Sequence, residues 1–164
     1  MKKAFVLVLF SLVTVFLSSS AFAMDKATPQ EVKAKVEEAV KLIQEKGDAA
    51  YPIIRDKNGP FVWKDAYVFI SKLEGTMLVH INGKLEGRNM MGSKDATGKL
   101  FHAGMVDALN ASPTGTWYEY QWVKPGEKTP SPKVSYLQIV PGTDIFAGAG
   151  VWDVTLEDIK KAGM

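Results

Sequence analysis

Trp117-Tyr-Glu-Tyr-Gln-Trp122 and Lys133-Val-Ser-Tyr136 predict two antiparallel strands, joined by a Pro/Gly loop from Lys124 to Pro132. Strand side chains alternate between the two faces of a sheet, so one face of the first run carries Tyr118, Tyr120 and Trp122. These rings predict an aromatic wall, which belongs either to the hydrophobic core or to a ligand pocket. Lys133 places a positive charge beside the wall, and this combination is typical of a pocket for a small anion.

The first residues have the composition of a secretory signal. A basic start precedes an apolar run at 4–17, and Ala21-Phe-Ala23 supplies small residues for cleavage. We therefore expect a signal peptide at 1–23 and a mature chain at 24–164, in the periplasm or secreted. The apolar run is shorter than the roughly 20 residues of a membrane-spanning helix. An uncleaved anchor in the inner membrane, facing the periplasm, is the alternative.

Composition limits the function further. The chain has no cysteine, which excludes disulfides, thiolate metal sites, attached c-type haem and a cysteine nucleophile. Removing the leader removes Lys2 and Lys3 and brings the net charge of +2 to zero, so we expect no nucleic-acid partner. About 140 residues remain, the size of one domain.

The mature chain opens with a predicted amphipathic helix. Thr28-Pro-Gln-Glu31 reads as a capping box with proline at the first helical position, and Gly47 offers a C-terminal cap. The apolar residues at helical spacing are Val32, Val36, Val40 and Ile43. This stripe packs either on the sheet of the same domain, the usual outcome, or on a partner helix. A shorter helix is expected at 48–55.

The remaining elements complete an α+β domain. Strands are predicted at 67–71 and 77–81, with Glu74-Gly75 as their hairpin turn, and at 145–151. A polar loop at 82–98 and a helix at 100–109 form a cap, and Thr155 caps a short terminal helix. We predict a five-stranded antiparallel sheet with a long N-terminal helix and a helical and loop cap.

Several phrases, in this order, resemble the single Cache domain of bacterial extracytoplasmic sensors, a PAS-like fold. They are Tyr67-Val-Phe, Met77-Leu-Val-His80, Glu86-Gly-Arg-Asn89, Lys94-Asp-Ala-Thr-Gly98, Gly115-Thr-Trp-Tyr-Glu-Tyr-Gln-Trp122, Pro132-Lys-Val-Ser-Tyr136 and Gly148-Ala-Gly150. The resemblance implies a ligand-binding module without catalysis. It also implies recognition of small molecules, commonly short carboxylates, on the concave sheet face beneath the cap.

In chemotaxis receptors and sensor kinases of this kind the domain lies between membrane helices that carry its signal inward. Here the sequence ends at Met164, just after the predicted domain, so we expect a free-standing periplasmic sensor domain that binds a small organic acid. The alternative is an interaction protein that docks on a membrane sensor, or forms a homodimer, through the helix at 28–46.

Nine side chains are candidates for ligand binding. They are Tyr67, His80, Arg88, Met90, Tyr118, Tyr120, Trp122, Lys133 and Tyr136. Lys133 or Arg88 would hold the carboxylate and the aromatic residues would enclose its apolar tail. Lys133 and Tyr136 lie on opposite faces of a regular strand, so a bulge is needed for both to line one pocket.

Nothing in the sequence predicts catalysis, a metal or another cofactor. Asp95-Ala-Thr-Gly98 lacks the further acidic positions of a calcium loop, and His102 and Asp107 do not share a helix face. Ser135 has no nucleophile-elbow setting. A small periplasmic enzyme, with His80 as its most suitable residue, is therefore the least favoured interpretation.

Overall fold

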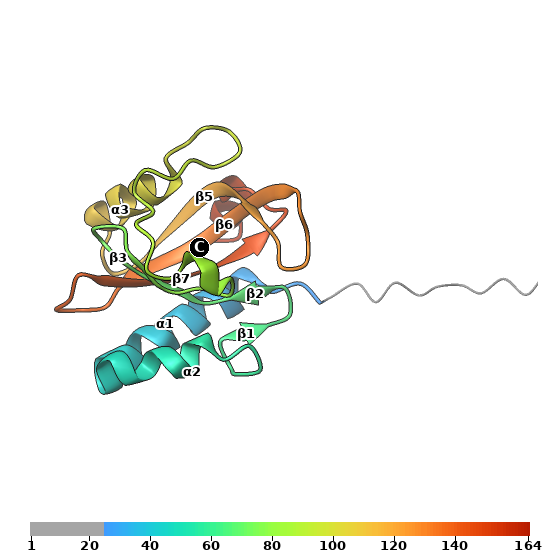
Figure 1. Ribbon diagram of the computed structural model, residues 1–164. Coiled ribbons are helices and arrows are strands. Elements are labelled where there is room, and N and C mark those ends of the chain that lie inside the picture. The colour runs from blue at the N-terminus through green and yellow to red at the C-terminus, as the bar shows by residue number, and fades with distance from the viewer. Residues whose placement is uncertain (1–24) are drawn as a thin grey trace, which may run out of the picture.

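A five-stranded antiparallel sheet, in the order β4-β3-β7-β6-β5, separates two layers of the molecule (Figure 1). Helices α1 and α2 lie on one face, and α3 with its neighbouring loops covers the other. This computed structural model describes residues 25–164, so the predicted signal peptide at 1–23 lies outside the described residues. The predicted α+β architecture is confirmed.

Helix α1 (Pro29–Lys46) begins and ends where the sequence predicts. Thr28 Oγ1 accepts the backbone N–H of Glu31 at 3.2 Å, and the Glu31 carboxylate accepts the N–H of Thr28 at 2.8 Å, which completes the capping box. The predicted apolar stripe is at most 4% exposed and packs on the sheet of its own domain. After Gly47, whose φ of 56° favours glycine, the chain continues into η1 (Gly47–Ala50) and α2 (Tyr51–Arg55).

The first predicted strand is divided in two. Residues Ala66–Tyr67 (β2) pair with Val62–Trp63 (β1) in a small separate sheet, and Phe69–Lys72 (β3) enters the main sheet. The second predicted strand is shorter than expected, because β4 covers only Met77–Val79. His80 therefore lies beyond the strand end, ahead of the short helix η2 (Gly83–Leu85).

The second half follows the predicted order: α3 (Phe101–Ala111), β5 (Thr116–Val123), β6 (Pro130–Ile139), β7 (Ile145–Trp152) and α4 (Leu156–Lys161). Strand β6 begins at Pro130 instead of Lys133. The last β6–β7 pair is Lys133 with Trp152, so the prolines at 130 and 132 lie beyond the end of β7 and pair with β5 alone. Their missing N–H groups are tolerated there because no strand requires them.

Glycines make room for side chains between the sheet and its cap. A Cβ on Gly150 would collide with the side chains of Ser135 and Lys133, and one on Gly104 of α3 would collide with Tyr118. The backbone oxygen of Val134 would also lie only 2.9 Å from a Cβ on Gly150. Within residues 25–164 no helix is long and apolar enough to span a membrane.

Candidate functional site

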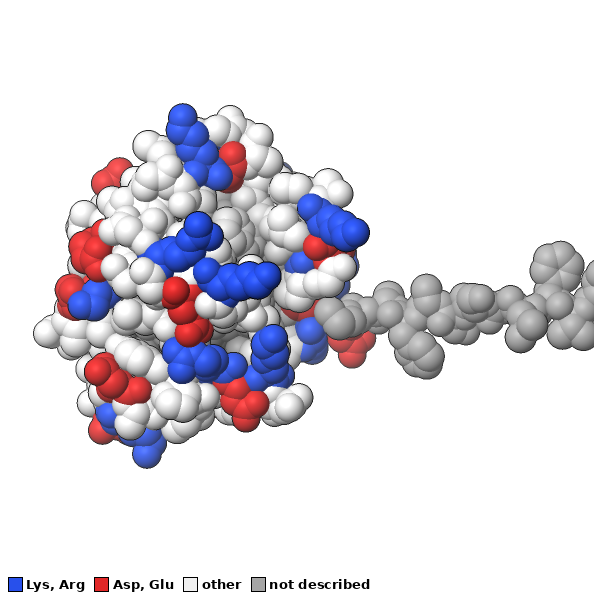
Figure 2. Space-filling model, in the orientation of Figure 1, with Lys and Arg blue, Asp and Glu red and all other residues white. Residues whose placement is uncertain are grey.

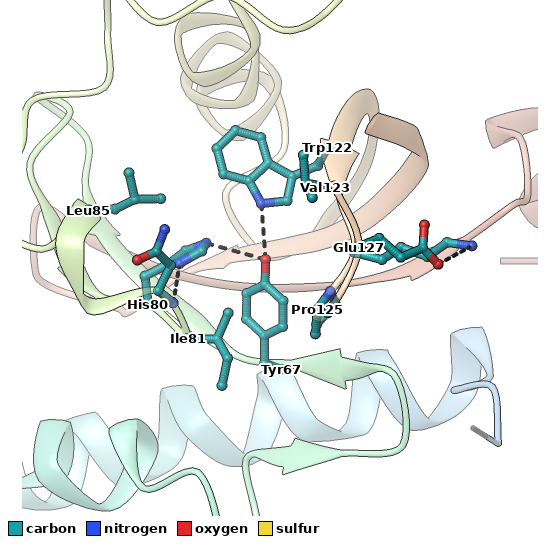
Figure 3. Close-up of a pocket in the computed structure, with 11 residues that line it drawn as sticks. Tyr67, His80, Ile81, Leu85, Trp122, Val123, Pro125 and Glu127 are labelled. Atoms are coloured by element: carbon teal, nitrogen blue, oxygen red, sulfur yellow. Dashed lines mark hydrogen bonds and ion pairs between the residues drawn. The ribbon is translucent and has the colours of Figure 1, made fainter. Parts of the chain in front are cut away.

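A cavity of about 480 Å³ opens on the cap side of the sheet, between the β5–β6 loop and the segment that follows β4 (Figure 3). This volume is typical of small-molecule sites. The lining residues are Tyr67, His80, Ile81, Asn82, Leu85, Trp122, Val123, Lys124, Pro125, Gly126 and Glu127. Apolar side chains therefore predominate, with a few polar groups among them.

Tyr67 provides the central polar atom of this cavity. Its side chain is almost fully buried, and its hydroxyl points between His80 and Trp122 (Figure 3). The indole N–H of Trp122 donates to the Tyr67 oxygen at 3.1 Å, and His80 Nε2 lies 3.3 Å from the same oxygen. Desolvation by burial holds the pKa of Tyr67 well above its usual value, so the phenol keeps its proton.

The protonation of His80 follows from its neighbours. The backbone N–H of Asn82 donates to Nδ1 at 2.9 Å, so Nδ1 carries no proton. Burial, together with the charge of Lys133, lowers the pKa of His80 to about 3, so the ring is neutral and its single proton lies on Nε2.

The Tyr67 oxygen thus accepts two hydrogen bonds, one from His80 Nε2–H and one from Trp122. Within residues 25–164, no acceptor is found for the proton of its own hydroxyl. A phenol is both donor and acceptor. Tyr67 therefore keeps one O–H donor that has no acceptor among the described residues.

Lys133 lies behind this tyrosine. It is 1% exposed, and its Nζ lies 4.2 Å from the ring centre of Tyr67 and 4.6 Å from that of Trp152. The contacts of its Nζ in the described part of the chain are with aromatic rings, Phe69 at 5.8 Å being the third, and no hydrogen bond or ion pair of this group is found there. Desolvation lowers the pKa of Lys133 to about 7, against a smaller opposing effect of Asp65. A buried ammonium stabilised by aromatic rings places positive potential beneath the cavity.

The space directly beneath α3 is filled. Phe101 stacks on Tyr120 with ring centres 5.4 Å apart and planes at 9°, and it also packs on Trp122 at 5.1 Å. The remaining void, about 10 Å³, accommodates at most about one water molecule. Trp122 and His80 line both this void and the larger cavity, so they form the wall between them.

The structure brings together only part of the predicted site. Tyr67, His80 and Trp122 line the cavity, and Lys133 lies behind Tyr67. Tyr118, Tyr120 and Met90 belong to the packing around the cap. The ligand-binding role of each remains a prediction.

Two of the predicted residues lie apart from the cavity. Strand β6 has no bulge, so Tyr136 faces α1, where it packs on Trp117 with ring centres 5.2 Å apart. Lys133 and Tyr136 thus lie on opposite faces of β6, as the alternation of a regular strand predicts. The geometry does not support one pocket lined by both residues. Arg88 lies in the loop after η2, where its carbonyl accepts the N–H of Met77, and it is not among the lining residues.

Loop residues of the cavity were not predicted. Lys124 is the basic side chain of the lining, and its Nζ lies 2.7 Å from Asp153 and 3.9 Å from Glu127. The only sequence signal for this loop was its Pro/Gly composition, which predicts a turn but not its contacts. On the face shown in Figure 2, basic and acidic side chains are mixed, so the local charge of the cavity arises from individual residues.

Residues 12–164 match the family model "Single Cache domain 2", and the chain therefore belongs to the single Cache domain family. The methyl-accepting chemotaxis protein McpP of Pseudomonas putida is 30% identical over 100 residues, which are 59% of this chain and 18% of McpP. The match thus spans less than a fifth of that receptor.

Solved structures agree with this assignment. A periplasmic sensor domain of a chemotaxis protein superposes with a TM-score of 0.65 at 26% identity, over 76% of this chain and 94% of that domain. A methyl-accepting chemotaxis protein from Vibrio parahaemolyticus gives a TM-score of 0.61 at 25% identity, over 75% and 86% of the two chains. A Cache chemosensory domain described for carboxylic acid recognition gives 0.66 at 24% identity, over 76% and 92%, and shows the shared fold.

The protein is therefore a Cache sensor domain of the kind found in chemotaxis receptors, a family of sensors rather than a class of enzymes.

Within residues 25–164, no three His, Asp or Glu side chains come together as a metal site.

Proposed function

We propose that this domain is a periplasmic sensor that binds a short monocarboxylate in the cavity above Tyr67. The observation that carries the proposal is the hydroxyl of Tyr67, whose oxygen already accepts two hydrogen bonds and whose proton is left for a ligand. A carboxylate oxygen is a strong acceptor for such a donor. The name of the structural relative that recognises carboxylic acids agrees with this chemistry.

Charge and shape support the same ligand class. Lys133 lies behind the Tyr67 ring, and at an effective dielectric of about 20 its attraction for an anion is on the order of 2 kcal/mol without direct contact. Lys124 adds a second positive group at the cavity wall, where it also pairs with Asp153 at 2.7 Å and with Glu127 of the lining at 3.9 Å. The apolar tail of the acid would contact Ile81, Leu85 and Val123.

The alternative role, docking through the N-terminal helix, has less support. The apolar stripe of α1 is buried against its own sheet, and the exposed side of the helix carries ion pairs such as Lys33–Glu37 and Lys35–Glu38. A charged surface of this kind is typical of a solvated helix face.

The test is calorimetric titration of the purified protein with acetate, propionate and butyrate. Replacing Tyr67 by Phe removes only the hydroxyl, and we expect the affinity for the tightest-binding acid to fall about ten- to a hundredfold, the loss of one charge-assisted hydrogen bond. The matched control is Tyr136→Phe on the opposite sheet face, for which we expect no change. Failure of all three acids to bind, or equal affinity in Tyr67→Phe, would refute the proposal.

A further inference from the structure

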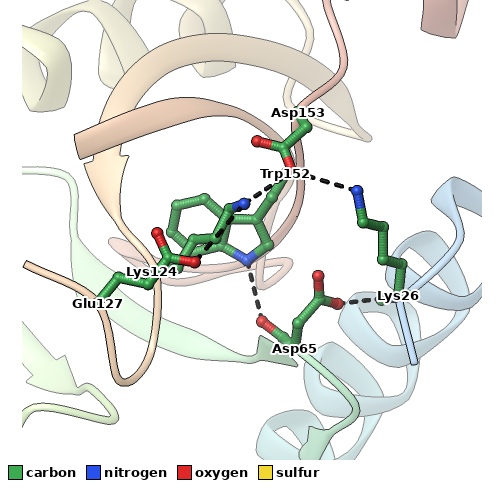
Figure 4. Close-up of polar contacts among 7 residues, drawn as sticks. Lys26, Asp65, Lys124, Glu127, Trp152 and Asp153 are labelled. Atoms are coloured by element: carbon green, nitrogen blue, oxygen red, sulfur yellow. Dashed lines mark hydrogen bonds and ion pairs between the residues drawn. The ribbon is translucent and has the colours of Figure 1, made fainter. Parts of the chain in front are cut away.

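Asp153 connects the cavity to the segment that precedes α1. Its Oδ2 lies 2.7 Å from Nζ of Lys124, which lines the cavity, and 3.2 Å from Nζ of Lys26 (Figure 4). The three residues come from the β5–β6 loop, the end of β7 and the N-terminal segment. One carboxylate oxygen thus holds two parts of the chain that are far apart in sequence.

The two lysines do not hold Asp153 equally. The Lys124 side chain is 17% exposed and that of Lys26 is 68% exposed, so the Lys124 pair is the better shielded from water. Both ammonium groups approach the same oxygen, and like charges at this separation repel. Each lysine therefore weakens the pair that the other forms.

A second connection runs parallel to the first. The indole N–H of Trp152 donates to the backbone oxygen of Asp65 at 2.9 Å, and the Asp65 carboxylate accepts the N–H of Ala27 at 2.7 Å (Figure 4). Lys133, behind the cavity, lies over the Trp152 ring. Residues 26 and 27 are thus tied to the end of the sheet where the cavity opens.

We propose that a carboxylate in the cavity draws Lys124 away from Asp153, and that Asp153 then holds Lys26 more firmly and fixes the segment that precedes α1. This inference rests on the proposed function and assigns a regulatory role to residues outside the cavity. Asp153 and a bound anion compete for the single ammonium group of Lys124. A strong ion pair with one of them therefore weakens the ion pair with the other. Binding and anchoring of the N-terminal segment are then coupled, and the coupling is reciprocal.

Because the coupling is reciprocal, two variants that leave the cavity lining intact should change the affinity for the acid in opposite directions. In Lys26→Ala, Asp153 holds Lys124 without competition, so we expect the acid to bind about two- to fivefold more weakly, the size of one exposed ion pair. In Asp153→Asn, Lys124 keeps only its longer 3.9 Å pair with Glu127 and is more available to the ligand, so we expect binding to become tighter by a similar factor.

The double variant separates this coupling from long-range charge effects. Removing Lys26 in the Asp153→Asn background should leave the affinity unchanged, whereas a general loss of positive charge would weaken binding in both backgrounds. The matched control is Lys41→Ala, which removes another exposed lysine of the N-terminal region and should have no effect.

The experiment is calorimetric titration of these variants with the acid of the acetate, propionate and butyrate series that binds the unaltered protein most tightly. Because the chain has no cysteine, Asp25→Cys with a nitroxide label reports directly on the segment, and we expect the acid to reduce its mobility. If an acid binds but Lys26→Ala and Asp153→Asn are unchanged in affinity, the coupling is overturned and the proposed function stands. If no acid binds, the proposed function fails and the coupling fails with it.

Discussion

The two faces of the sheet enclose different kinds of side chain. The α1 face buries an aliphatic cluster that includes Val36, Ile43 and Ile70, each at most 4% exposed. The cap face buries aromatic rings together with polar residues, which are Ser71, His80, His102, Lys133 and Ser135. Buried polar groups destabilise a fold unless they are paired. Within residues 25–164, Nδ1 of His102 on the cap side has no hydrogen-bond partner, and neither do Nε1 of Trp63 and Oε1 of Gln138 on the α1 side, so the contrast lies in how many polar side chains are buried and not in unpaired atoms.

This difference indicates a division of roles within one small domain. The α1 face supplies the stability of the fold through close packing. The cap face buries several polar side chains beside its aromatic rings, and the cavity above Tyr67 opens on this face. Substitutions on the two faces should therefore separate stability from binding.

The largest expected effect is on the α1 face. Ile70, in β3, is fully buried, and Ile70→Ala should lower the free energy of unfolding by about 2–5 kcal/mol because it removes packed methyl groups and leaves a cavity. Urea denaturation measures the change. The fraction that remains folded should bind acid with unchanged affinity, and a clear loss of affinity would show that the two faces are not separable in this way.

On the cap face, a substitution of Lys133 should raise the free energy of unfolding and lower the affinity for a short acid. Replacing Lys133 by Met keeps the length of the side chain and removes its buried charge, so we expect the free energy of unfolding to rise by about 1–3 kcal/mol. The affinity for a short acid should fall more than tenfold, because the positive potential beneath Tyr67 is lost.

Denaturation and calorimetry of the same Lys133→Met preparation test both statements. If Lys133→Met is less stable than the unaltered protein, the favourable contacts of the buried ammonium group outweigh the cost of removing it from water. Unchanged affinity in the folded variant would remove Lys133 from the binding site.

Local patterns predicted the parts of this fold that depend on neighbouring residues. The capping box at Thr28 and the helix cap at Thr155 mark the starts of α1 and α4, and the alternation of β5 places Tyr118, Tyr120 and Trp122 on one face. These features need only backbone geometry and the spacing of apolar residues. Strand-forming runs and the turn residues between them also predicted the five-stranded antiparallel sheet and its cap, and the family resemblance agreed with that architecture.

The site was less predictable because it depends on how distant segments meet. Lys124 was expected only as the start of a loop, and its place in the cavity follows from the pair with Asp153, 29 residues further along the chain. The aromatic wall was expected to enclose a ligand, yet Phe101 of α3 stacks on Tyr120 and fills that space. The spacing of aromatic residues along the chain does not show whether the rings of the sheet and of the helix fill the space between them or leave a cavity.

The smallest of these effects is a pH dependence that should also be confined to the cap face. Burial lowers the pKa of Lys133 to about 7, so acidification from pH 8 to pH 6 protonates it, and only the protonated form attracts a carboxylate. We expect the affinity for a short acid to be highest near pH 6 and to fall by up to about tenfold at pH 8, with proton uptake on binding.

Calorimetry in buffers of different ionisation enthalpy measures both the affinity and the proton uptake. The ligand stays ionised in this range, and His80, with a pKa lowered to about 3, stays neutral, so neither contributes. Lys133→Met should show a flat profile. A flat profile in the unaltered protein would mean that Lys133 does not change its charge between pH 6 and pH 8, and affinity that rises with pH would contradict an anionic ligand beside this lysine.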